Sequence, residues 1–280
     1  MKISTLLLGG VATLFSASIA LAADAADVAA LPGISGDFSI WGGLSSQHIV
    51  ESNIQDFTGN LFGMMARGNW WVNNDLNIQL DGSGEFWQTT EDGGFNTSVM
   101  DAAAHFDWRH GNDGLFGGFL SVGMNNDFDA PASFGTIALE AQQTWSNFTL
   151  YGQAGYTTSI AGGGSDLPLN AKYLHAAARF AVTPNIGLGA DAGYAWIDMD
   201  DHARNVLRWG AKIDAAIPNT PLDIFLNYQG HYTDVTESGD KVTVHALLVG
   251  LTLNFNSDAA KSMRQDDNPF TGVNYPRDAY

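Results

Sequence analysis

Ionisable residues recur at every second position in several segments of this chain. Successive side chains of a β-strand point to opposite faces, so each such set would share one face of a strand. Charges on one face of a sheet can pair with one another or line an aqueous passage. The candidate lining residues are Arg67, Asp81, Glu85, Asp101, His105, Asp107, Arg109, His175, Arg179, Arg208, Lys212, Asp214 and His231, with Asn69, Tyr173, Asn227 and Gln229 on the same faces.

Catalytic and cofactor chemistry find little support in these residues. His105 lies between Asp101 and Asp107 and could act as a general base, but a salt-bridge network with Arg109 is the simpler expectation. No serine has a histidine at usable spacing on its own strand together with a third orienting group. The glycines fall at strand positions, where they permit bends, and form no phosphate-binding loop. We therefore predict no enzymatic activity and no cofactor.

The composition narrows the class of protein further. Of 280 residues 15% are charged and none is cysteine, whereas soluble domains carry about 25% charged residues. Without cysteine there is no disulfide scaffold and no thiolate chemistry. The net charge of −18 becomes −19 if the segment containing Lys2 is removed, which argues against nucleic acid as a partner.

The first 22 residues have the features of a secretory signal peptide. Lys2 supplies the positive charge, residues 6–22 are apolar, and Ala20-Leu21-Ala22 forms a cleavage site, so the mature chain should start at Ala23. Residues 23–35 would then form a periplasmic N-terminal segment. Beyond residue 22 no run of 18 apolar residues occurs, so no membrane-spanning helix is expected.

From residue 36 to 255 apolar and polar residues alternate with a period of two, as in "LNIQLDGSGEF" (76–86). Most segments have about 11 residues or more, which is long for a soluble sandwich and suits a tilted strand that crosses a bilayer. The sequence predicts an all-β protein, a single closed antiparallel transmembrane barrel with about twelve strands; ten is the alternative. The expected strands are 37–45, 60–72, 75–87, 98–109, 115–126, 134–146, 148–158, 171–182, 186–197, 205–217, 222–233 and 242–255.

The connections should alternate between short periplasmic turns and longer outside loops. Short turns are expected at 73–74, 110–114, 146–147, 183–185 and 218–221, and longer loops at 46–59, 88–97, 127–133, 159–170, 198–204 and 234–241. Aromatic residues cluster beside both sets of connections, as two interfacial girdles would require. The girdle beside the turns would contain Trp70, Trp71, Phe106, Trp108, Phe116, Trp145, Phe148, Phe180 and Phe255, and the other Phe86, Trp87, Phe134, Tyr156, Tyr194, Trp196 and Tyr232.

The last expected strand, "LVGLTLNF" (248–255), resembles the C-terminal assembly signal of outer-membrane β-barrel proteins. Gly250, Leu253 and Phe255 match its glycine and its two hydrophobic positions, whereas Leu248 stands where a polar residue is usual and Phe255 is not the chain end. With the pattern of the whole chain, this segment resembles small porin-like proteins of Gram-negative outer membranes. The resemblance implies a cell outer-membrane location, contact with lipid and lipopolysaccharide, and recognition by the outer-membrane assembly machinery.

The sequence leaves open the roles of the C-terminal tail and of the acidic loops. The tail (256–280) breaks the alternation and contains Pro269 and Pro276, so it is either a flexible periplasmic extension or a segment whose residues 268–275 dock into the barrel mouth or a periplasmic partner. The expected outside loops carry an excess of acids, which either solvate the loops, attract cations to the mouth, or bind divalent cations that bridge to lipopolysaccharide phosphates. The segment "DMDDH" (198–202) has carboxylates but no known calcium-loop spacing, so no metal site is predicted.

Side chains fill the interior of a barrel with about eight strands, whereas barrels with about 16–18 strands leave an open channel. A barrel with twelve strands should have an interior of intermediate width. The inward residues Gly187, Gly189, Gly193 and Ala195 are small, which favours space in the lumen. The sequence therefore favours a channel for passive diffusion of small hydrophilic solutes, cations preferred. The alternative is a structural or surface-interaction barrel with a filled lumen, anchored to the envelope through its tail.

Overall fold

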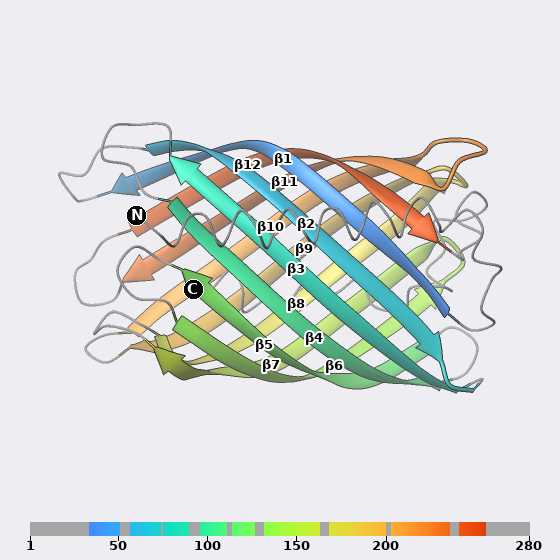
Figure 1. Cartoon of the computed structure of the whole chain (residues 1–280), viewed down its shortest axis with the longest axis horizontal. Coiled ribbons are helices and arrows are strands. Elements are labelled where there is room, and N and C mark those ends of the chain that lie inside the picture. Colours follow the sequence, from blue (N-terminus) through green and yellow to red (C-terminus); the bar gives the residue numbers. More distant parts are fainter. Residues whose placement is uncertain are drawn as a thin grey trace, which may run out of the picture.

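A computed structural model describes residues 34–50, 57–73, 75–89, 96–110, 114–126, 132–162, 168–199, 203–235 and 241–255. These residues form twelve strands that close into a single antiparallel barrel, in which each strand pairs with its chain neighbours and β1 pairs with β12 (Figure 1). The predicted fold class and strand number are confirmed, and the alternative of ten strands is wrong. The strands are β1 (Ile34–Val50), β2 (Phe57–Trp71), β3 (Leu76–Thr89), β4 (Asn96–His110), β5 (Gly114–Asn126), β6 (Ala132–Trp145), β7 (Phe148–Gly162), β8 (Pro168–Thr183), β9 (Ile186–Met199), β10 (Ala203–Ala216), β11 (Leu222–Val235) and β12 (Lys241–Phe255).

The register of the strands sets the width of the barrel. Paired residues lead from Ser35 on β1 around all twelve strands to Ile49, also on β1, a shift of 49 − 35 = 14 residues. With about 3.3 Å per residue and about 4.8 Å between strands, this shift corresponds to a strand tilt of about 39° and a radius of about 12 Å. The inclination of the strands to the barrel axis is visible in Figure 1. Such a radius leaves space that side chains fill only in part.

The strands extend further than the sequence pattern indicates. They have 13 to 17 residues, which at this tilt span about 33–44 Å along the axis, more than the about 30 Å of a hydrocarbon core. Their backbone pairing therefore continues beyond the bilayer, where apolar alternation is no longer required, and β1 ends at Val50 instead of residue 45.

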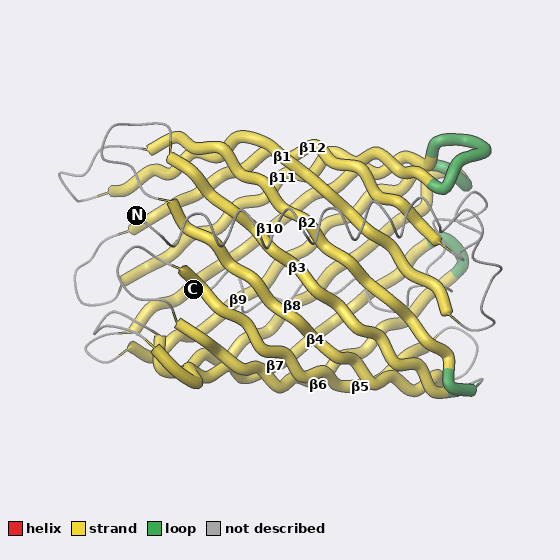
Figure 2. Tube along the Cα trace, viewed as in Figure 1, coloured by secondary structure: helices red, strands yellow, loops and turns green. Residues whose placement is uncertain are grey.

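The same extension shortens the loops. The connection 200–202, expected to be long, is shorter than the expected short turn between β10 and β11, where the strands leave 217–221 unpaired. The strict alternation of short and long connections was therefore wrong at this place. The described turns nevertheless all lie at one end of the barrel, as Figure 2 shows; we call it the turn end, and the opposite end the loop end.

Several predictions fall on residues outside these ranges. They are the signal peptide (1–22), residues 23–33 of the N-terminal segment, the tail (256–280) and residues 200–202 of the acidic segment. Ile34 and Ser35, assigned to the N-terminal segment, begin β1 instead. The loop acids outside the described ranges are Glu51, Asp56, Glu91, Asp92, Asp127, Asp129, Asp166, Asp200, Asp201, Glu237 and Asp240.

The exterior of the barrel is apolar. On β6, Leu139 is 63% exposed, whereas its neighbours Ala138 and Glu140 are 5% and 2% exposed and face the lumen. Leu80, Leu120 and other large apolar residues repeat this pattern on the remaining strands. The part of the chain that the structure describes contains no helix long and apolar enough to span a bilayer. A closed barrel with a continuous apolar exterior satisfies every strand edge and suits hydrocarbon surroundings.

The aromatic girdles differ from the prediction at three positions. Trp71, Trp87 and Phe134 occupy the alternate positions that face the lumen, whereas their neighbours Trp70 and Phe86 face outward. Trp71 lies beneath the guanidinium of Arg109, whose Cζ is 4.5 Å from the ring centroid. Adjacent aromatic residues on one strand cannot both face lipid, because the side-chain period of a strand is two.

Candidate functional site

A polar network runs along the inner wall of the barrel from β1 to β7. Arg67 on β2 lies between two carboxylates, with its Nε 3.9 Å from Asp37 on β1 and 3.8 Å from Asp81 on β3. Asp81 also accepts hydrogen bonds of 2.9 Å from Gln79 and lies 3.2 Å from Nε2 of His105 on β4. These contacts join side chains on four successive strands, because the alternation places each of them on the inner face.

The network continues at Glu140 on β6, which is 2% exposed. One of its oxygens lies 2.7 Å from Nδ1 of His105. The other accepts hydrogen bonds from the hydroxyl of Tyr151 at 2.8 Å and from the amide of Gln153 at 3.5 Å. Since both ring nitrogens of His105 face carboxylate oxygens, the arrangement fits an imidazolium that donates on both sides. Buried charges are tolerated in such a wall because each has a partner of opposite sign.

The opposite wall carries two separate ion pairs. Arg179 on β8 donates to Asp214 on β10 at 2.7 Å, and His175 lies 3.6 Å from Asp191 on β9. The Lys212 ammonium lies 4.5 Å from the ring centroid of Phe225. This wall therefore places cations and carboxylates side by side.

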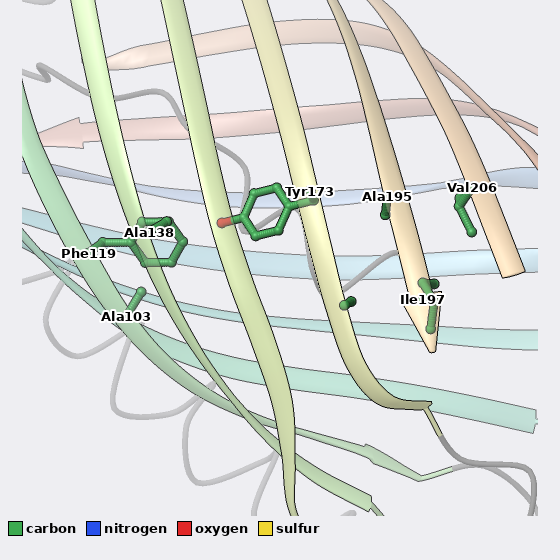
Figure 3. Close-up of a cluster of buried hydrophobic side chains, with 8 residues drawn as sticks. Ala103, Phe119, Ala138, Tyr173, Ala195, Ile197 and Val206 are labelled. Carbon is green, nitrogen blue, oxygen red and sulfur yellow. The ribbon is translucent and has the colours of Figure 1, made fainter. Parts of the chain in front are cut away.

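An apolar cluster fills the other part of the lumen. Phe119, Tyr173 and Ile197 are at most 2% exposed, although their positions face the barrel interior. They pack with Ala103, Ala138, Ala171, Ala195 and Val206, on strands from β4 to β10 (Figure 3). Gly155 makes room for this packing, since a Cβ there would lie 2.5 Å from the ring of Tyr173. We call this group the apolar cluster; it closes one side of the lumen to water.

Two cavities lie in the described part of the lumen. The larger has a volume of about 290 Å³ and reaches toward the turn end, where Asp223 and Asn254 contribute to its lining. The smaller, of about 130 Å³, lies toward the loop end, where Thr97 and Val244 line it. Its wall comes from β10 through β12 and β1 through β4, opposite the apolar cluster. The open space of the lumen is thus displaced from the barrel axis near the loop end.

The structure places all of the predicted lining residues on the inner face of the barrel. The larger cavity is lined by Arg67, Asp81, Asp101, His175, Arg179, Arg208, Lys212 and Asp214, and the smaller by Glu85, Arg208 and His231. His105, Asp107 and Arg109 line neither of these two cavities: His105 and Asp107 are packed within the wall, and Arg109 covers Trp71. The expected contact of His105 with Arg109 is replaced by its contacts with Asp81 and Glu140.

Sequence reasoning missed four inward carboxylates, Asp37, Glu140, Asp191 and Asp223. The alternation itself contained the signal. Asp191 occupies the same face as Gly189 and Gly193, and Glu140 lies one residue from the outward Leu139. The inward side chains of β9 are therefore larger than expected, because Asp191 stands between the two glycines.

Comparisons with known proteins identify the fold. No protein-family model and no curated protein matches the chain. Among solved structures, the COG4313 outer membrane channel from Pseudomonas putida F1 superposes with a TM-score of 0.58 at 11% identity, covering 81% of this chain and 97% of that one. The chain shares the fold of this outer-membrane β-barrel.

Two further solved barrels are less similar. The translocator domain of the autotransporter NalP from Neisseria meningitidis gives a TM-score of 0.48 at 11% identity, covering 92% of this chain and all of that chain. The KdgM porin gives 0.45 at 8% identity, covering 78% and 99%. A shared fold does not determine a role, so the role of this chain has to be argued from its lumen.

Proposed function

We propose that this outer-membrane barrel is a channel for passive diffusion of small hydrophilic solutes, with cations favoured. The observation that carries the proposal is the charged lining of the larger cavity. Six carboxylates face four cations in it: Asp37, Asp81, Asp101, Asp191, Asp214 and Asp223 against Arg67, Arg179, Arg208 and Lys212. The excess of negative charge in a confined space raises the local concentration of cations.

Two further features support this proposal. The larger and the smaller cavity are both lined by Arg208 and Gln229, so they adjoin one another along the lumen. The Pseudomonas putida protein that shares the fold is described as an outer membrane channel. The proposed role needs no chemical step, and the inward charges act by attracting or repelling the solute.

Planar-bilayer recording of the purified, folded barrel tests the proposal. We expect discrete unitary conductance steps in KCl, and a reversal potential in a salt gradient that indicates a preference for K⁺ over Cl⁻. The matched control is the same protein heat-denatured before addition, which should produce no steps. Absence of unitary conductance contradicts the channel, and a clear anion preference contradicts the role assigned to the carboxylates.

The second candidate is a structural barrel that anchors the envelope. The apolar cluster favours it, because Phe119, Tyr173 and Ile197 fill space that a wide channel would leave open. A deletion strain separates the two. Slower uptake of small charged solutes with an intact envelope supports the channel, whereas normal uptake with increased sensitivity to detergents supports the anchor.

A further inference from the structure

The junction between the two cavities is formed by two side chains. Arg208 on β10 and Gln229 on β11 are the residues that line both the larger and the smaller cavity. A solute that crosses the lumen along these cavities passes both side chains. The apolar cluster occupies the wall from β4 to β10, and none of its residues lines either cavity.

The register fixes the surroundings of Arg208. Its cross-strand partners are Gly193 on β9 and His231 on β11, and its side chain is 4% exposed. Asp191 lies on the turn-end side of Arg208 and packs against Gly210. A Cβ on Gly210 would lie 2.3 Å from Oδ1 of Asp191. Arg208 therefore places a positive charge between the acid-rich larger cavity and the smaller one.

Charged side chains that line a passage determine which ions it favours. A guanidinium stays charged at all accessible pH values. The junction therefore opposes cations, while the larger cavity behind it attracts them.

We propose that Arg208 is the residue that sets charge selectivity in this channel, by limiting a cation preference that the lumen carboxylates would otherwise make strong. The inference rests on the proposed channel function. A unit charge about 4 Å from an ion in water changes the local ion concentration by about fivefold. Removing the charge of Arg208 should raise the local cation concentration and lower the local anion concentration, each by about that factor, so the ratio of cation to anion permeability should rise severalfold, up to about 25-fold.

The test compares reversal potentials in a KCl gradient for four proteins: wild type, Arg208→Gln, Arg208→Lys and Lys172→Gln. Lys172 is the matched control, because it is an exposed cation on an outward position of β8. We expect a severalfold rise in the permeability ratio for Arg208→Gln, a ratio close to that of wild type for Arg208→Lys, and no change for Lys172→Gln.

A second variant guards against a folding defect. Gln229→Glu keeps Arg208 and adds a negative charge at the same junction, so it should shift the ratio in the same direction. If wild type conducts and both Arg208→Gln and Gln229→Glu keep its ratio, the junction inference is overturned while the channel stands. An equal shift in Lys172→Gln overturns it as well, and a wild type that does not conduct overturns the channel and the inference together.

Discussion

Glu140 is the lumen residue whose loss should destabilise the barrel most. It accepts from three side chains, at 2.7 Å from Nδ1 of His105, 2.8 Å from the hydroxyl of Tyr151 and 3.5 Å from the amide of Gln153. All three partners are at most 5% exposed, so water does not replace the lost acceptor. Glu140→Ala leaves buried donors and one buried positive charge without their partner.

The cost follows from burial. Breaking a buried charge pair by removing one partner costs about 3–5 kcal/mol. This cost raises the equilibrium constant of unfolding by a factor of about 10² to 10⁴. Tyr151→Phe removes only a hydroxyl, and with it the bond to Glu140 and the 2.9 Å bond from Gln153. That variant should lose about 2–4 kcal/mol, since a hydrogen bond to a charged group contributes about 1.5–3 kcal/mol and a neutral one about 0.5–1.5 kcal/mol.

Urea unfolding of the barrel in detergent micelles measures these differences. The eight tryptophans report unfolding by fluorescence, and the faster electrophoretic migration of the folded, unheated barrel gives an independent measure. Because Glu140 lines neither of the two cavities, conductance of the folded fraction should match wild type. A free energy of unfolding within about 1 kcal/mol of wild type would refute the view that this network holds the inner wall together.

Two further predictions concern packing on each face of the wall. Gly155→Ala should lower the free energy of unfolding by about 1–3 kcal/mol, because the new Cβ would lie 2.5 Å from the ring of Tyr173. Gly152→Ala is the control: its Cβ would meet nothing nearer than 3.9 Å, so the free energy of unfolding should be close to that of wild type in the same urea titration. Leu139→Arg, in the middle of β6 on the lipid face, should cost about 2–4 kcal/mol, and Ile160→Arg, near the end of β7, about 0–1 kcal/mol; equal costs at the two positions would contradict the placement of the bilayer.

The sequence was sufficient for the fold because each strand carries its own evidence. Alternation in "LNIQLDGSGEF" marks two faces without reference to any other strand, and the same rule assigned Asp81 and Lys212 correctly to the lumen. It also failed locally. Trp87 and Phe134 were grouped by their nearness to a loop, although their parity places them inside.

Contacts across the lumen could not be read in the same way. The pairing of His105 on β4 with Glu140 on β6 skips a strand, and it depends on the 14-residue shift that sets how far each strand climbs around the barrel. Period-two patterns define faces and leave this shift undetermined. The cavity lining depends on it too, because Arg67 on β2 and Arg179 on β8 face one cavity only if both lie at compatible heights.

The bore of this barrel is therefore set by its side chains more than by its strand number. A radius of about 12 Å is fixed by twelve strands and their shift, yet Phe119, Tyr173 and Ile197 close the wall from β4 to β10. The polar network stiffens the adjoining wall through Arg67 and Glu140. None of these three apolar residues lines either of the two cavities, whereas charged side chains, Arg208 among them, line both. Because these side chains reduce the open space, the proposed channel would admit only small solutes.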